Sequence, residues 1–340
     1  MLVPCFLLGF FVLVSGPTPS LQIPKNIQVL LDTRQYLQAE QFIQSELEHR
    51  PAWDVGYLLL AQIYSVTGRH DLAERAALSA VRLRESLDGF MLLALASQRL
   101  SKINESIEWL EKAARRQPAN PEVYRLLGVN YALGGMMKES EKSFRRSVEL
   151  DPKNWELHYL LGRSLYEADD LKNAEEAFQR AIEQSPSSVK TWTALGQVQE
   201  SLHHRALAEE SYRKALQLCG SQARECAWPM LQMGFLTERQ KGAREAEPFF
   251  RRAVAVRPDW AKPHFYLGKA LVALGNLRDA QDELETAVRL DEGKSQYHYQ
   301  LAQLYRRLKQ TQKAKEHLTR YQALAELERK QKATVDLSTE

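Results

Sequence analysis

The stretch of residues 121–154 constrains this chain more than any other, because its plan repeats along almost the whole sequence. Val123 and Leu127 begin a run with apolar residues at spacings of three and four, which is the period of a helix buried on one side. Gly134 and Gly135 then interrupt the run, since glycine weakens helices and favours turns. A second amphipathic run follows, and a proline ends it. The stretch predicts a helical hairpin, which needs stacked neighbours to bury its apolar face.

The neighbours appear when Gly128 is counted as the eighth position of a 34-residue repeat. The eighth position is small in eight repeats: Ala61, Ala94, Gly128, Gly162, Gly196, Gly234, Gly268 and Ala302. The twentieth is small in nine: Ala39, Ala73, Ser106, Ser140, Ala174, Ala208, Ala246, Ala280 and Ala314. The twenty-fourth is usually large and apolar: Ile43, Leu110, Phe144, Phe178, Tyr212, Phe250, Leu284 and Leu318. Small positions let two helix backbones approach, and the large residues fill the space beside them.

Proline ends five of these repeats at position 32: Pro51, Pro118, Pro152, Pro186 and Pro258. With these positions the chain resembles the tetratricopeptide repeat (TPR) family, whose pattern is W-x2-L-G-x2-Y…A-x3-F…P over 34 residues. The resemblance covers about residues 20–328. It implies an all-α solenoid of about nine helix-turn-helix repeats, wound as a right-handed superhelix and closed by a C-terminal capping helix.

The predicted repeats have the following bounds: 20–53 (degenerate), 54–86, 87–120, 121–154, 155–188, 189–222, 227–260, 261–294 and 295–328. The first is degenerate because Ile27 takes its small eighth position. Pro248 lies inside a predicted second helix and is expected to bend it or to move its start. The last helix has no proline stop, so we expect it to cover the open end of the core and extend into solvent through residues 329–340. The tail from Ala333 is expected to fray.

The first nineteen residues are predicted to be a secretory signal. Residues 1–20 carry no charged side chain, and residues 2–14 are an apolar run too short to span a bilayer comfortably. A cleaved signal predicts an exported protein, periplasmic or secreted. Because no basic residue precedes the run, an uncleaved membrane anchor, with the array outside the cytoplasm, stays open as the alternative.

Removal of that segment leaves two cysteines, Cys219 and Cys226. They flank an insertion in the register, since Gly196 and Gly234 are 38 residues apart instead of 34. In an oxidising compartment they could form a disulfide that pins the insertion. The alternative is a pair of reduced, half-buried thiols. Their spacing is not that of a short C-x2-C zinc knuckle.

Composition and motifs favour a non-enzymatic protein. The chain has 46 Lys and Arg against 43 Asp and Glu. The net charge of +3 does not indicate a basic surface for binding nucleic acid. The enzyme motifs that we sought are absent, so no catalytic, cofactor or metal residue is predicted. His203 and His204 fall in a predicted turn, and the fourth-position residues His158, His264 and His298 read as packing rings. A metal-dependent hydrolase is the enzymatic alternative.

The TPR resemblance places the functional surface on the first helix of each repeat. In the family, positions 2, 5, 9, 12 and 13 line a concave groove. Here the residues at these positions that suit an interface are Arg125, Tyr159, Arg163, Tyr166, Lys190, Trp228, Phe235, Arg239, Phe265, Lys269, Tyr299, Arg306 and Arg307. The alternative for the aromatic members is packing between repeats.

The expected partner is another protein, held as a peptide or helix in this groove. Two specialised TPR types do not match. The cochaperone carboxylate clamp needs Lys and Asn where this chain has Met91 and Leu95, and the asparagine ladder of the O-glycosyltransferases is replaced by residues such as Leu126. The expected function is an exported scaffold or assembly factor. A membrane-tethered subunit of an envelope or secretory-pathway complex is the alternative; the oligomeric state stays open.

Overall fold

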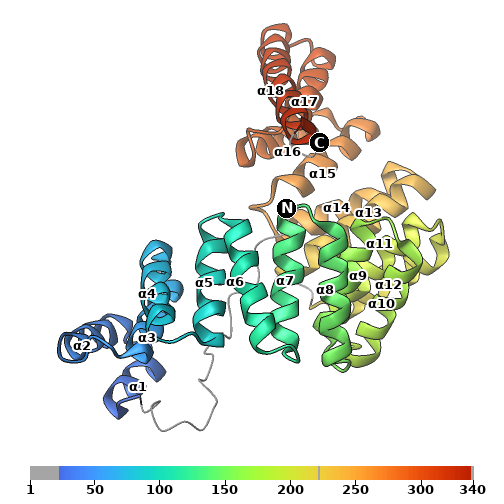
Figure 1. The fold of residues 1–340 in the computed structure, drawn as a ribbon. Helices are drawn as coiled ribbons and strands as arrows, with labels where there is room; N and C mark the ends of the chain where they lie inside the picture. Colours follow the sequence, from blue (N-terminus) through green and yellow to red (C-terminus); the bar gives the residue numbers. More distant parts are fainter. Residues whose placement is uncertain (1–22, 221–222, 338–340) are drawn as a thin grey trace. The chain divides into compact units, whose positions relative to one another are not determined.

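The computed structural model describes residues 23–220 and 223–337, with side chains through residue 330 (Figure 1). The predicted signal segment, residues 1–19, lies outside the described residues. The described elements are 18 α-helices and one short 3-10 helix. None of these helices is both long and apolar enough to cross a membrane. The chain divides into two bodies, Met1–Asp169 and Asp170–Glu340.

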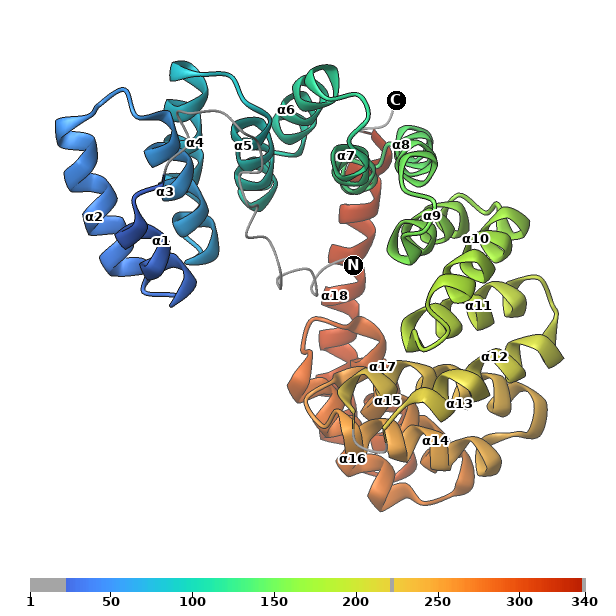
Figure 2. The ribbon, with the colours of Figure 1, turned by 90° about the horizontal axis from the view of Figure 1, so that it is seen from below.

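The N-terminal body holds nine helices, which have these bounds: α1 Lys25–Asp32, α2 Tyr36–His49, α3 Asp54–Val66, α4 His70–Leu83, α5 Leu87–Arg99, α6 Ile103–Arg116, α7 Pro121–Leu133, α8 Met137–Leu150 and α9 Trp155–Glu167. Helices α3 and α4, α5 and α6, and α7 and α8 pack as antiparallel pairs, and each later pair rests on the one before it (Figure 2). The helices α3, α5, α7 and α9 each begin at the first residue of a predicted repeat.

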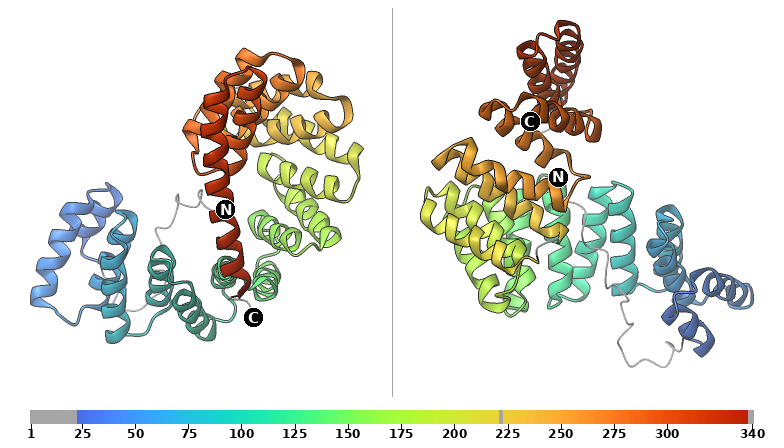
Figure 3. Two further views of the ribbon diagram at one scale, coloured as in Figure 1. Left: turned by 90° about the horizontal axis from the view of Figure 1, so that it is seen from above. Right: turned by 180° about the vertical axis from the view of Figure 1, so that it is seen from behind.

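The C-terminal body holds the remaining elements: α10 Leu171–Gln184, α11 Val189–Ser201, α12 Arg205–Leu218, η1 Arg224–Cys226, α13 Ala227–Lys241, α14 Ala243–Val256, α15 Ala261–Leu274, α16 Leu277–Leu290, α17 Ser295–Arg307 and α18 Thr311–Leu337. Helices α11 to α18 form four antiparallel pairs in chain order (Figure 3). Each body is therefore a stack of helix pairs, and the chain is the all-α solenoid that its periodicity predicts.

In the pairs α7–α8, α11–α12 and α13–α14, a glycine at position 8 faces an aromatic ring at position 24. A Cβ on Gly196 would lie 2.5 Å from Tyr212 Cε1, and a Cβ on Gly234 would lie 2.5 Å from Phe250 Cε1. Both rings are fully buried. Each glycine therefore gives up side-chain contacts so that its helix can lie directly on the ring of its partner helix.

The small residues at position 20 serve the same contact from the other helix. Ser106 Oγ donates a hydrogen bond to the Ala94 carbonyl at 2.7 Å, and Ser140 Oγ donates one to the Gly128 carbonyl at 2.8 Å. Both serines are fully buried, so these bonds satisfy hydroxyls that water cannot reach. The two small positions thus bring the helices of a pair into backbone contact range.

A ring N–H at position 4 ties each of several repeats to the turn before it. Trp192 Nε1 donates to the Pro186 carbonyl at 2.8 Å, and the Nε2 atoms of His158, His264 and His298 lie 2.9 to 3.1 Å from the carbonyl six residues earlier. Histidine can replace tryptophan here because both rings present an N–H at the same reach. The predicted packing rings therefore also carry hydrogen bonds.

Helix α18 covers the end of the C-terminal body, as predicted. It runs beside α17, where the Tyr299 and Tyr321 rings lie 5.0 Å apart and Ser295 Oγ donates to Glu328 at 2.8 Å. The helix continues through Leu337, and fraying of the tail from Ala333 stays a prediction. Pro248 does not delay its helix, because α14 begins at Ala243.

Replacing Gly196 by Trp should overfill the contact with Tyr212 and lower the free energy of unfolding by about 1–3 kcal/mol or more. Chemical denaturation followed by circular dichroism would measure the change. The control is Ala206→Trp, at an exposed position of α12 in the same pair, which should have little effect. An unfolding transition that Gly196→Trp leaves unchanged would show that this register of the helix pair is wrong.

The His264 ring should make stability depend on pH. Burial opposes its charge, but the pKa of His264 is raised from 6.5 because Glu283 accepts a bond from Nδ1 at 2.6 Å and the Pro258 carbonyl accepts one from Nε2. A raised pKa in the folded state gives stability that is fully present below pH 6.5 and lost as the pH rises through the folded value. Imidazole NMR titration should place the His264 pKa above 6.5 and, in Glu283→Gln, closer to it. A wild-type value at or below 6.5 would contradict this reading.

Candidate protein-binding face

The first helices of the pairs form one continuous side of each body. Helix α3 contacts α5 in the N-terminal body, and α11 contacts α13 and α15 contacts α17 in the C-terminal body. The second helices instead contact the first helix of the following pair, as α12 does α13 and α14 does α15. Some first helices therefore also contact the first helix of the next pair, on the side of the stack away from the second helices.

The predicted groove residues differ in how much of each the solvent reaches. The exposed members are Lys190, Arg239, Tyr299, Arg306 and Arg307. The half-buried members are Arg125, Tyr159, Arg163, Tyr166, Trp228, Phe235 and Lys269. Both groups stay candidates for partner contact.

Phe265 is the exception, and its prediction as a groove contact was wrong. Its side chain is only 1 % exposed. The ring stacks on Tyr297 with centroids 4.6 Å apart and meets the edge of Tyr266 at 5.1 Å. Phe265 therefore fills the space between α15 and α17, which is the packing role that the sequence had left open for the aromatic positions.

In the N-terminal body, the predicted arginines are already neutralised by acids on their own helices. Arg125 donates to Glu122 from both Nε and Nη2, at 2.6 and 2.5 Å, and Arg163 donates to Glu167 at 2.9 Å. Such pairs within a helix satisfy the guanidinium locally. These residues offer a balanced polar surface rather than unmatched positive charge.

The C-terminal body differs, because two lysines on α15 lie over aromatic rings. We call the residues Trp228, Phe235, Lys262, Tyr266 and Lys269 the α13–α15 face. Lys262 Nζ lies 4.6 Å from the centroid of the Trp228 ring, and Lys269 Nζ lies 5.4 Å from that of Tyr266. The Phe235 and Tyr266 rings pack edge to face at 4.4 Å. Both ammonium groups thus lie over aromatic rings in cation–π contacts.

Neither lysine of this face forms an ion pair with a carboxylate in the described part of the chain. Burial lowers the pKa of Lys262, because it disfavours the charged ammonium. The nearby Tyr266 has a pKa raised by burial and then by the charge of Glu238. The face therefore combines aromatic anchors with cations that a partner's carboxylates could satisfy.

Sequence reasoning missed two members of this face. Lys262 occupies position 2 of its repeat, which is a groove position, so the signal for it was present. Tyr266 occupies position 6, which is not a groove position. Its place in the face is seen only from its contacts with the Phe235 ring and the Lys269 ammonium.

The cysteine pair closes the loop that enters this face. Cys219 and Cys226 are joined by a disulfide with their Cα atoms 5.7 Å apart. Cys219 follows the last residue of α12, and the fully buried Cys226 precedes the first residue of α13. Of the two alternatives for these cysteines, the structure has the disulfide, and it spans the inserted residues.

No group of three or more His, Cys, Asp or Glu side chains that could hold a metal ion occurs in the described residues. His203 and His204 are both exposed in the turn between α11 and α12, where His203 has a φ of 62°. Nothing in their surroundings supplies further ligands among those residues.

Replacing both Cys219 and Cys226 by Ser should loosen the junction of α12 and α13. The closed loop is short, with a sequence separation of 7, so its loss should cost about 2 kcal/mol in the chain-entropy model. Thiol titration of a Cys5→Ala protein, recovered without reductant, should find no reactive thiol before reduction and two after it. Two reactive thiols in the unreduced protein would contradict the disulfide.

Comparison with known proteins agrees with this architecture. Tetratricopeptide repeat models match residues 91–154, 137–189, 159–223, 239–304 and 295–330. A search of curated proteins finds none that matches the sequence.

Solved structures give the same fold at low sequence identity. The C-terminal part of a TPR protein from Cytophaga hutchinsonii aligns at a TM-score of 0.58 and 15 % identity, covering 72 % of this chain and 98 % of that one. Yeast Tom70 aligns at 0.56 and 17 %, covering 86 % and 59 %. Cut9, from the APC/C hetero-tetramer Cut9-Hcn1, aligns at 0.55 and 18 %, covering 84 % and 56 %. The chain thus spans little more than half the length of Cut9 or Tom70. By its repeat matches and its fold, the chain belongs to the tetratricopeptide repeat family.

Proposed function

We propose that this protein is a non-enzymatic scaffold or assembly factor that holds an acidic peptide or helix of a partner protein on the α13–α15 face. One observation carries the proposal: Lys262 and Lys269 rest on aromatic rings, and neither forms an ion pair with a carboxylate in the described residues. Aromatic rings and cations at a half-buried surface are typical of interface anchors.

The spacing of the two lysines defines what the face would recognise. They lie seven residues apart on α15, about 10 Å along its axis. A partner helix with carboxylates seven residues apart matches this distance and presents both of them on one face. Each carboxylate would gain an ammonium that is already partly dehydrated, so less solvation is lost on binding than for a fully hydrated lysine.

The family supports protein partners in general. Cut9, which shares the fold, is described in a hetero-tetramer with Hcn1, an assembly in which an array of this kind occurs with another protein. For this chain we carry over only the class of partner, a protein.

We further propose that the protein is exported by the apolar segment of residues 1–19. Support for this comes from its lack of charge, and from the disulfide between Cys219 and Cys226, which is typical of oxidising compartments. A membrane-tethered subunit of an envelope or secretory-pathway complex is the alternative, in which the same segment stays attached.

Reversing the charge of both lysines should remove the partner. In a crosslinking pulldown from the native compartment, Lys262→Glu/Lys269→Glu should recover the partner about tenfold less well than the wild type. The matched control is Lys172→Glu/Arg278→Glu, which reverses two exposed cations at the same position of the second helices α10 and α16 and should keep the partner.

Equal recovery by the lysine variant would refute the α13–α15 face as the binding site. The intact mass of the recovered protein tests its location in the same experiment. A mass without the first residues supports export with cleavage, and the full mass supports the tethered alternative. Phe265 is not a useful target, because its buried ring stabilises the packing of α15 on α17.

A further inference from the structure

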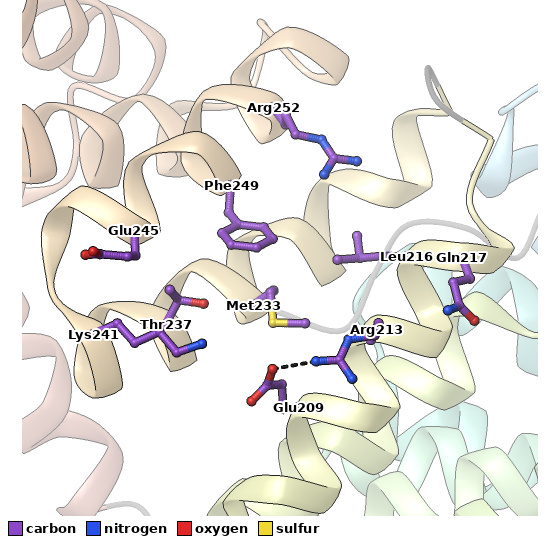
Figure 4. Close-up of a pocket in the computed structure, with 10 residues that line it drawn as sticks. All are labelled: Glu209, Arg213, Leu216, Gln217, Met233, Thr237, Lys241, Glu245, Phe249 and Arg252. Carbon is purple, nitrogen blue, oxygen red and sulfur yellow. Dashed lines mark hydrogen bonds and ion pairs between the residues drawn. The ribbon is translucent and has the colours of Figure 1, made fainter.

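A hollow of about 440 Å³ lies on the second-helix side of the C-terminal body, between α12 and α14 with α13 as its floor (Figure 4). We call it the α12–α14 hollow. Its residues are Glu209, Arg213, Leu216, Gln217, Met233, Thr237, Lys241, Glu245, Phe249 and Arg252. It faces away from the α13–α15 face, since Phe235 is two residues from both Met233 and Thr237 and so points about 200° round the helix.

Three other junctions between repeats fill the corresponding place with a tyrosine ring, while Ser97, Leu165, Gln199 and Leu271 stand at the rest. Each tyrosine is at position 11 of the first helix, and its ring reaches the second helix of the preceding repeat. Tyr131 donates to Glu111 at 2.9 Å, Tyr305 donates to Glu285 at 2.5 Å, and Tyr64 accepts from Gln44 at 3.2 Å. Each partner lies 20 residues earlier in the chain.

We call these tyrosine rings plugs, because each fills the space between two adjacent repeats. Tyr64 and Tyr305 are buried. Burial and then the hydrogen bond to Glu111 raise the pKa of Tyr131 to about 12. Where position 11 is tyrosine, its phenol therefore fills the space between adjacent repeats. It donates to a carboxylate at Tyr131 and Tyr305 and accepts from an amide at Tyr64.

The junction of α12 and α13 lacks both halves of this contact. Position 11 is Thr237, and the position that carries Gln44, Glu111 or Glu285 elsewhere is Arg213, once the four inserted residues are counted. Both residues line the hollow. Small size alone does not open a junction, because Ser97 at the same position is fully buried and bonds Glu74. Here the small residue coincides with the insertion between α12 and α13.

The walls of the hollow are suited to an aromatic side chain that has a carboxylate near it in the same segment. Leu216, Met233 and Phe249 give an apolar centre, as Figure 4 shows. On the rim, Arg213 is paired with Glu209 at 2.6 Å. Lys241 and Arg252 have no carboxylate partner among the described residues, and Glu245 is the remaining acid on the rim. The rim thus keeps one positive charge in excess.

We propose that the α12–α14 hollow is a second protein-docking site, which takes a tyrosine or phenylalanine side chain from a partner segment that carries a carboxylate next to the ring. The ring takes the place that Tyr64, Tyr131 and Tyr305 occupy at three other junctions. The carboxylate meets Arg252 or Lys241. This site uses other helix faces than the α13–α15 face, so either can exist without the other.

The test uses the full-length, disulfide-bonded protein labelled with ¹³C at its methionine methyl groups. Met233 lies in the floor of the hollow and reports occupancy directly; Met233→Leu assigns its signal. The probe is a capped Glu-Tyr-Glu tripeptide at up to millimolar concentration. Capped Glu-Ala-Glu and Lys-Tyr-Lys are the peptide controls, and 4-hydroxyphenylacetate represents a free aromatic acid.

Two substitutions of Thr237 give the matched comparison. Thr237→Tyr restores the plug found at Tyr131 and Tyr305, whereas Thr237→Val keeps the hollow at the same size. Glu-Tyr-Glu should shift the Met233 signal in a saturable way in the wild type and in Thr237→Val, and about tenfold more weakly or not at all in Thr237→Tyr. Lys-Tyr-Lys and Glu-Ala-Glu should bind weakly or not at all.

A further variant keeps the test decisive should Thr237→Tyr fail to fold. Arg252 is exposed on the rim, and Arg252→Glu should weaken Glu-Tyr-Glu and favour Lys-Tyr-Lys. A Met233 signal that no peptide shifts, or that shifts equally in Thr237→Tyr, would overturn the site. Tighter binding of 4-hydroxyphenylacetate than of the tripeptide would overturn the protein occupant and indicate a small-molecule site.

Discussion

The contact between a glycine and a buried aromatic ring, in the pairs α7–α8, α11–α12 and α13–α14, is the constraint on which much of this structure depends. At Gly196 and Gly234 the helix backbone lies so close to the partner's ring that a single Cβ would overlap it. Close approach fixes the rotation of both helices about their axes. It thereby decides which residues of the first helix enter the pair, which face the next repeat, and which remain for other molecules. The binding surfaces therefore follow from this one contact.

Rotation fixed in this way divides helix α13 between two different surfaces. Phe235 faces the side where the first helices meet, while Met233 and Thr237 face the second helices α12 and α14. A repeat protein stabilises itself through contacts between neighbours, so it can vary the outward residues of one repeat at little cost to the rest. The C-terminal body uses this freedom twice, with lysines over aromatic rings on one side and a missing tyrosine on the other.

Sequence periodicity predicted the helix pairs well because position 8 and position 24 meet within one repeat, where the distance along the chain is short. The disulfide partners could also be named, since Cys219 and Cys226 are the two cysteines beyond the predicted signal. Exposure of the groove residues was harder to predict, because it depends on the next repeat. Phe265 is covered by Tyr297 of α17, and no pattern within its own repeat reveals that contact. Lys262 stands at a groove position of its repeat, but its contact with the Trp228 ring, on another helix, could not be predicted from that position.

Departures from a repeat carry more information about function than the repeat itself. Gly196 or Ser140 would be selected in any array of this fold, since they allow helices to pair. Thr237 has no such role: a tyrosine at that position closes the junction at Tyr131 and Tyr305. Arg213, at the facing position, could donate to a tyrosine oxygen as Gln44 does to Tyr64, but it could not accept a hydrogen bond as Glu111 and Glu285 do. The tyrosine and the carboxylate acceptor are thus both absent at the junction where four residues are inserted and Cys219 is bonded to Cys226. This joint loss leaves a hollow in which Leu216 and Phe249 stay partly exposed over the buried Met233, and a partner's ring could cover them.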